Sequence, residues 1–292
     1  MIARLRFLTL ICVLTLPTLL RAQAVTPALI DQALGRSGQK TGDVYRVSFP
    51  RTDLHVSVKG VAIKPGLALG SWAAFLGTDD KAMVMGDLVL LEDELNPVMA
   101  KLRSSGFEIS AVHNHLMEET PKVLYMHYMG HGPATQLATS LRAALSLSKT
   151  PLEKPVVPAE EAAAPAWVET VEDAVGRKAT YKGGVLSYGV PRSDTITMAG
   201  MTITPAAGVG EAINFQAADS GNVATTGDFV LTADEVNPVI SALQEHSIQV
   251  TALHSHMLTE QPRLFFMHFW CVGSPESVGA GIKAALSKVQ TK

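Results

Sequence analysis

The chain has 292 residues and a net charge of −3, with 47% hydrophobic and 17% charged residues. This length fits about two ordinary domains, and the composition excludes a chain that is disordered throughout. The small net charge offers no basic surplus for nucleic acid or an anionic membrane. We therefore expect a folded protein whose partner is a small molecule or a component of the cell envelope.

The first 24 residues have the features of a secretory signal peptide. Arg4 and Arg6 form a basic start, residues 7–20 an apolar run, and residues 22–24 a small-x-small cleavage site. The apolar run is too short to span a bilayer comfortably. We expect an exported product, periplasmic or secreted, with no membrane span. Its single cysteine, Cys271, cannot form an internal disulfide.

Residues 26–35 predict a helix that Gly35 can end, because four apolar residues have helical spacing. Residues 54–65 alternate between apolar and polar positions and predict two strands that turn at Gly60. Between them lies a Pro-Arg-x-Asp segment. We interpret Arg51 and Asp53 as a structural ion pair, with recognition of an anionic substrate as the alternative.

Gly86-Asp87 predicts a turn, followed by a short apolar strand and a helix. Asn96 and Pro97 suit the N-cap and first positions of that helix. A capping box is the alternative start, but the first half has Leu91 where the box needs Ser or Thr. The elements that follow are a strand, a connection, an apolar strand and a closing helix, over residues 107–115, 116–121, 122–129 and 134–146.

The second half repeats the first at a constant offset of 141, since 227 − 86 = 141 for Gly86 and Gly227. Asp87, Asp93, Glu94, Asn96, Pro97, His113, His115, Glu119, Pro121 and His127 recur as Asp228, Asp234, Glu235, Asn237, Pro238, His254, His256, Glu260, Pro262 and His268. A duplicated sequence drifts wherever drift is tolerated, so shared positions mark what both halves still hold in common.

The predicted fold class is α+β, with two tandem copies of one module. Residues 150–166 lack periodicity and are rich in Pro, Ala and Glu, so they predict a linker. The domains expected are a signal peptide over residues 1–24, a first module over residues 25–149, and a second module over residues 167–292.

The candidate site is a His-x-His pair near the end of a strand, with a third histidine on the next strand. Alternation places His113 and His115 on the apolar face that also carries Phe107, about 6–7 Å apart at Cβ. We expect each module to hold a divalent transition metal, zinc or alternatively copper, since imidazole suits both. The predicted ligands are His113, His115 and His127, and in the second copy His254, His256 and His268. The alternative is that the histidines are structural and hydrogen-bonded.

Glu119 and Glu260 follow the His-x-His pairs at the same spacing in both copies. Each is a candidate catalytic residue that would act as a general base, with a fourth metal ligand or a solvated loop residue as alternatives. His-x-His-x3-Glu also matches the start of the cupin metal motif. The second half of that motif is missing, and predicted helices stand where a cupin has strands.

The segments HNHLMEETPKVLYMHY and HSHMLTEQPRLFFMHFW, each with GDxVLxxDExNPV upstream, resemble the LppY/LpqO family of exported bacterial proteins. The resemblance covers nearly the whole mature chain and implies export. It implies little about activity, because the function of that family is unknown. Its mycobacterial members resemble lipoproteins, whereas this chain lacks a lipobox.

Two functions follow from the pattern as hypotheses. The first is an exported metal-dependent hydrolase or lyase. The second is a non-catalytic protein that binds or handles metal. An open coordination position beside a cleft would favour the enzyme, and a closed four-ligand site would favour the binding protein.

Overall fold

The computed structural model describes residues 24–153 and 163–292. The predicted signal peptide, apart from its last residue, and the centre of the predicted linker lie outside the described residues. No helix in the part of the chain that the structure describes is long and apolar enough to cross a membrane.

Both halves fold as α+β modules, which confirms the predicted fold class. The first contains α1 (Pro27–Leu34), β1 (Gln39–Thr41), β2 (Val44–Pro50), β3 (Ser57–Val58), β4 (Val61–Ala62), α2 (Pro65–Ala68), β5 (Gly70–Gly77), β6 (Ala82–Leu91), α3 (Glu92–Ser104), β7 (Glu108–His113), β8 (Glu119–Thr120), β9 (Val123–Gly132) and α4 (Ala134–Leu145). The second contains α5 (Ala166–Val175), β10 (Thr180–Lys182), β11 (Val185–Pro191), β12 (Ile196–Met198), β13 (Met201–Ile203), η1 (Pro205–Ala207), β14 (Gly210–Ala217), η2 (Asp219–Gly221), β15 (Val223–Leu231), α6 (Ala233–Glu245), β16 (Gln249–His254), β17 (Phe265–Gly273) and α7 (Pro275–Leu286).

Each module is built on one antiparallel sheet, and the two sheets have the same strand order. The first runs β1-β2-β5-β6-β9-β7, and the second runs β10-β11-β14-β15-β17-β16. The register repeats as well, because Asp87 lies opposite His127 in one sheet and Asp228 opposite His268 in the other. The duplication in sequence is therefore a duplication in structure.

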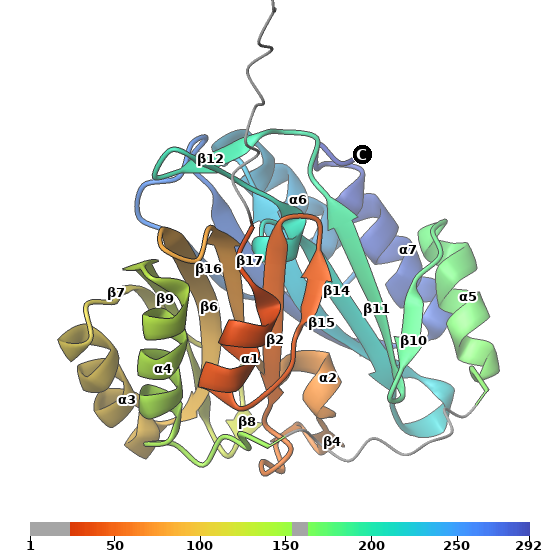
Figure 1. The fold of residues 1–292 in the computed structure, drawn as a ribbon. Coiled ribbons are helices and arrows are strands. Elements are labelled where there is room, and N and C mark those ends of the chain that lie inside the picture. Colours follow the sequence, from red (N-terminus) through yellow and green to blue (C-terminus); the bar gives the residue numbers. More distant parts are fainter. Residues whose placement is uncertain (1–23, 154–162) are drawn as a thin grey trace, which may run out of the picture.

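The strands lie between α3 and α4 on one side and α5 and α7 on the other, while the short α2 lies between the modules (Figure 1). The helix-side core of each module contains only its own residues, such as Phe107 and Met126 in the first. Two further buried clusters combine residues of both modules, as where Met85 and Met129 join Met198 and Phe266. Each sheet thus has a helix face and an opposite face, here called the inner face, which packs against the other module.

Each module also extends an arm onto its neighbour. Gln216 on β14 donates to the Ala62 carbonyl at 2.7 Å and accepts from the Lys64 main chain at 2.9 Å. In the other direction, η1 packs on β2 and β5, and Arg46 donates to the Ala206 carbonyl at 3.2 Å. Main-chain groups bound in this way fix the two sheets relative to each other.

The predicted start of the helix at Asn96-Pro97 is wrong, because α3 begins at Glu92 and Pro97 lies inside it. The Glu94 carboxylate accepts the N–H of Leu91 at 2.9 Å and so caps the helix from its third residue. No hydroxyl at Leu91 is needed for that half of a capping box.

The structural interpretation of the Pro-Arg-x-Asp segment is correct. Arg51 is fully buried, and it pairs with Asp53 at 2.8 Å and with Glu94 at 2.7 Å. Arg192 repeats the arrangement with Asp194 and Glu235. The helix-capping carboxylate is therefore also the partner of a buried cation, which joins β2 to α3.

The expectation that Phe107 and His113 share a face is wrong. A β-bulge between Ile109 and Ala111 shifts the register of β7 on β9. Phe107 therefore belongs to the helix-side core, while His113 lies opposite Tyr125 and shares its inner face. One extra residue in a strand reverses the direction of every side chain after it. The same bulge occurs in β16 between Val250 and Ala252.

Candidate metal centre between the modules

The six predicted histidine ligands meet at one place between the two sheets. They form three pairs across the module interface, each from one histidine of either module. The ring centroids are 3.6 Å apart for His113 and His254, 3.5 Å for His127 and His256, and 3.7 Å for His115 and His268. The sequence predicts a separate site inside each module, but the structure merges the two triads into one cluster.

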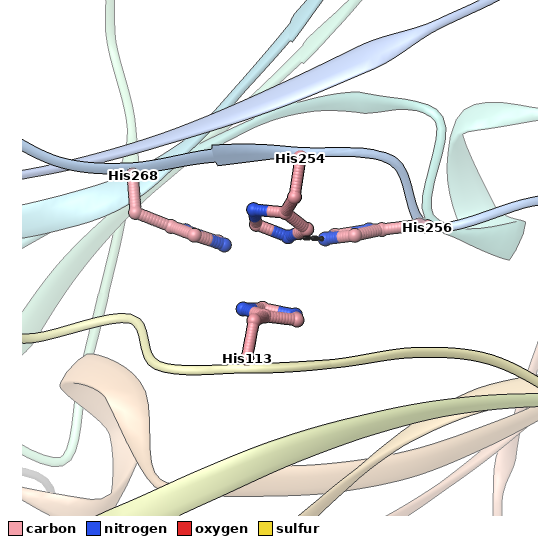
Figure 2. Close-up of side chains that lie close together, drawn as sticks. All are labelled: His113, His254, His256 and His268. Atoms are coloured by element: carbon pink, nitrogen blue, oxygen red, sulfur yellow. Dashed lines mark hydrogen bonds between the residues drawn. The ribbon is translucent and has the colours of Figure 1, made fainter.

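His113 and His254 occupy equivalent positions, since 254 − 113 = 141, so the pseudo-twofold axis passes between their rings. Figure 2 shows His113 on one side of the cluster, facing His254, His256 and His268 on the other. The nearest ring nitrogens of these four all lie within 4.8 Å of one another. His113, His115 and His127 form a second such group, so every triad converges and the groups overlap.

Two aspartates for which the sequence predicts a role in turns, Asp87 and Asp228, join the cluster. Asp87 lies in β6, with carboxylate oxygens 3.8 Å from His127 Nε2 and 4.0 Å from His115 Nε2. Asp228 lies in β15, 2.9 Å from His268 Nδ1, and it forms a third group with His115 and His268. The turn interpretation is therefore wrong. The presence of this aspartate in both copies already indicated a shared role, and the strand pairing shows why, because each aspartate lies opposite a histidine of the cluster.

Hydrogen bonds orient several rings and leave other nitrogens unpaired. His268 Nδ1 lies 3.1 Å from the Gly227 carbonyl oxygen, while its Nε2 is buried and without a partner among the described residues. His115 Nε2 and His254 Nδ1 are unpaired in the same sense, as is Asp87 Oδ1. Buried polar atoms are normally satisfied, so the concentration of unpaired donors at this place is the pattern expected of side chains that bind a cation.

Burial lowers the pKa of several imidazoles in the cluster. The pKa of His113 falls to about 4 and that of His254 to about 2, first because burial disfavours the charged form and then through repulsion from neighbouring histidines. His115, His127 and His256 shift in the same direction for the same reasons. These rings are neutral at pH 7, which is the form that binds metal.

Side chains at the bulges connect each module to the other's His-x-His segment. The Ser110 hydroxyl donates to the His256 carbonyl at 2.5 Å, and the Thr251 hydroxyl donates to the His115 carbonyl at 2.5 Å. Aromatic rings close the two ends of the cluster, with Tyr125 stacked on His115 at 3.4 Å and Phe266 stacked on His256 at 3.6 Å. The bulge thus both turns the histidines inward and fixes their main chain.

Glu119 and Glu260 belong to none of the three groups of possible ligands found among the described residues. Glu119 accepts from Asn114 Nδ2 at 3.1 Å and lines an open hollow beside His113. Glu260 is fully buried and accepts the Leu264 N–H at 2.9 Å. The carboxylates that the structure brings to the histidines are Asp87 and Asp228.

A cavity of about 620 Å³ opens beside the cluster, between the modules. Its wall includes Asp87, Asp228, His127 and His256, together with Arg46. Cavities of roughly 300–1,000 Å³ suit small-molecule ligands. The cluster therefore has a space next to it that can admit a substrate.

Two solved structures show a distant likeness. A crystal structure of the trimeric bacterial microcompartment shell protein PduB is 10% identical, with 87% of this chain and 89% of that chain covered at a TM-score of 0.21. A crystal structure of EtuB from Clostridium kluyveri is 9% identical, with 86% and 90% covered at a TM-score of 0.19. TM-scores this low carry no argument about fold or function.

No curated protein matches the sequence. A family model described as Domain of Unknown Function (DUF1259) matches residues 28–147 and again residues 169–288. The two matches together span well over half of the chain, and they fall on either side of the predicted linker. The chain therefore belongs to the Domain of Unknown Function (DUF1259) family, of which it carries two copies in tandem.

Proposed function

We propose that this chain is an exported, metal-dependent enzyme, a hydrolase or lyase acting on a small molecule, with one metal centre shared by the two modules. The observation that carries the proposal is the set of buried, unpaired donor atoms in the cluster. His115 Nε2, His254 Nδ1, His268 Nε2 and Asp87 Oδ1 lack partners among the described residues, although each is shielded from water.

The donor set fits zinc or copper. Neutral imidazole binds both metals. The arrangement at His268 also fits, because its Nδ1 contacts Gly227 and Asp228 while its Nε2 points free. A histidine held in this way presents its second nitrogen in a fixed direction and with raised basicity.

A metal bound there would supply Lewis-acid chemistry. The residues of the chain would supply the proton transfer. Burial, followed by repulsion from Asp228, raises the pKa of Asp87 well above its ordinary value, so this carboxyl can hold a proton beside the cavity. Asp228, at 2.9 Å from His268, would orient that ring. Asp87 takes the acid–base role that the sequence suggested for Glu119 and Glu260.

Non-catalytic metal handling is the second candidate. Six histidines exceed the four positions of a tetrahedral site. A surplus of donors suits a protein that binds more than one ion or passes an ion along. Export and the resemblance to LppY/LpqO proteins are compatible with both candidates and remain part of the proposal.

Metal analysis of the purified, full-length protein tests the shared centre. The wild type should retain about one or two equivalents of zinc or copper, and the His113→Ala/His254→Ala double variant should lose most of it. His131→Ala is the matched control, because His131 is exposed and outside the cluster. Equal metal content in the wild type and the double variant would refute the metal centre. A wild type that binds metal but transforms no ester, amide or hydroxy acid in a substrate screen would favour metal handling.

A further inference from the structure

One wall of the cavity carries a cation that the metal centre does not use. Arg46 lies on β2, half-buried, with its guanidinium carbon 3.9 Å from the centre of the Trp72 ring. Stacking on an aromatic face fixes the plane of a guanidinium and leaves its edges available for hydrogen bonds. Both residues line the cavity beside Asp87.

The guanidinium is only partly satisfied by the protein. Its hydrogen bond within the described residues goes to the Ala206 carbonyl at 3.2 Å, and no carboxylate in those residues forms an ion pair with it. Burial lowers the pKa of Arg46 to about 10, and the nearby Asp87 and Asp228 oppose that shift without contacting the guanidinium. A half-buried arginine without an anionic partner is costly unless a ligand completes it.

Two other charged groups on the same wall, Arg36 and Glu211, each make hydrogen bonds to main-chain groups of the protein. Arg36 donates to the carbonyls of Pro151 and Glu153 at 3.2 and 2.8 Å. Glu211 accepts the Val230 N–H at 2.7 Å and lies 4.0 Å from Arg192. Of the two arginines that line the cavity, Arg46 is the one whose aromatic partner, Trp72, also lines it, since Arg36 lies over Phe49 instead.

The second module has no counterpart to this feature. The strand registers make Ser187 the equivalent of Arg46, since each pairs with the first residue of the neighbouring short strand. Ala212 is the equivalent of Trp72, because each lies opposite the aspartate of its module. The metal-binding residues repeat in both modules, while the stacked arginine occurs once. Arg46 therefore makes the two sides of the cavity chemically different, although the histidine cluster beside it is symmetric.

We propose that the cavity binds a small organic acid, with its carboxylate on the edge of the Arg46 guanidinium and its apolar body against Trp72, Pro205 and Ala206. A carboxylate matches the fork of donors that a stacked arginine presents. The acid then lies beside Asp87 and His127, on the same wall. The inference deepens the proposed function, because it names the substrate class of that site.

Calorimetric titration with benzoate tests the anion site, with the metal content of every sample measured in parallel. The wild type should bind benzoate, and Arg46→Ala should bind it about tenfold or more weakly, the loss expected for a charged hydrogen-bonded contact. Arg46→Lys keeps the positive charge but loses the paired guanidinium donors, so its benzoate affinity should lie between those of the wild type and Arg46→Ala. Ser187→Ala, the twin position, should bind benzoate as the wild type does. Unchanged metal content and unfolding temperature in Arg46→Ala would show that the fold and the centre are intact.

Three outcomes would overturn the inference. These are equal benzoate affinity in the wild type and Arg46→Ala, an equal loss in Ser187→Ala, and tighter binding of inorganic phosphate than of benzoate by the wild type. Failure of the metal centre is read separately. If the wild type contains no metal but still binds benzoate through Arg46, the proposed function is refuted and the anion site is supported. If the wild type contains metal but does not bind benzoate, the metal centre is supported and the anion site is refuted.

Discussion

The two modules present the same histidines to the interface but differ in what surrounds them. The first has Tyr125, Arg46 and Trp72 where the second has Phe266, Ser187 and Ala212. Residues on the pseudo-twofold axis serve both modules at once, so a change to one is a change to the shared centre. Residues away from the axis serve one side and are free to specialise. The contrast separates what builds the centre from what gives it a substrate.

The largest expected effect on the free energy of unfolding comes from protonating the clustered histidines in the metal-free protein. The unfolded chain takes up protons on its histidines below about pH 6.5, whereas the buried histidines resist until a lower pH. Stability is thus full above pH 6.5 and falls as the pH drops. Each buried histidine contributes a slope of up to about 1.4 kcal/mol per pH unit.

His113 and His254 should stop contributing at different points of that titration. The pKa of about 4 ends the contribution of His113 there, while the pKa of about 2 extends that of His254 further into acid. Denaturant unfolding measured from pH 7 to pH 3 checks the slope. His113→Phe should have a shallower slope between pH 6.5 and pH 4. A stability that does not change across this range contradicts burial of neutral imidazoles.

The second largest effect on the free energy of unfolding is expected from breaking the buried ion pairs. Arg51→Ala leaves Glu94 buried without its partner, which typically costs about 3–5 kcal/mol. Arg192→Ala should cost more, because Glu235 and also the fully buried Glu211 then lose their cation. The free energy of unfolding in urea measures both. Equal losses would show that Glu211 does not depend on Arg192.

Single substitutions on the axis should affect metal binding alike. His113→Ala and His254→Ala each remove one donor from the same centre, and each should weaken binding by on the order of 10–100-fold. Competition with a chromogenic chelator measures the two affinities. A loss confined to one variant would mean that the modules bind metal independently.

The bulge hydroxyls should give the smallest effect. Ser110→Ala and Thr251→Val each remove one hydrogen bond to the opposite module, worth about 1 kcal/mol. Both should lower the unfolding temperature by a few degrees, as roughly expected for a domain of this size. Thr139→Ala, on the exposed side of α4, is the control, because its hydroxyl bonds only within its own helix.

The duplication, the α+β class and the six histidines could be predicted because the chain repeats itself at a fixed offset. The inner position of His113 could not be predicted from alternation, since the bulge at Ser110 leaves no mark in a pattern of apolar residues. The sequence predicts a turn at Gly86-Asp87. In the structure Gly86 lies in a strand, where a side chain would collide with Trp72 and Tyr128.

The sequence of one module could not predict that the two triads form a single cluster. Each triad alone has spacing that suits a metal, and nothing local to His113 indicates that His254 lies 3.6 Å away. That contact depends on how the two sheets pack, which is set by Met198, Phe266 and other apolar side chains spread over both modules.

The pairing of His113 with His254 on the axis has an evolutionary consequence. A polypeptide with one copy of this domain carries one triad and would have to associate with a second molecule of itself to assemble the six-histidine cluster. Tandem fusion removes the need for that encounter, because the tether holds the second copy at a high local concentration. In a tandem chain the two halves need not be identical, so one copy can carry an arginine that a symmetric dimer would have to carry twice.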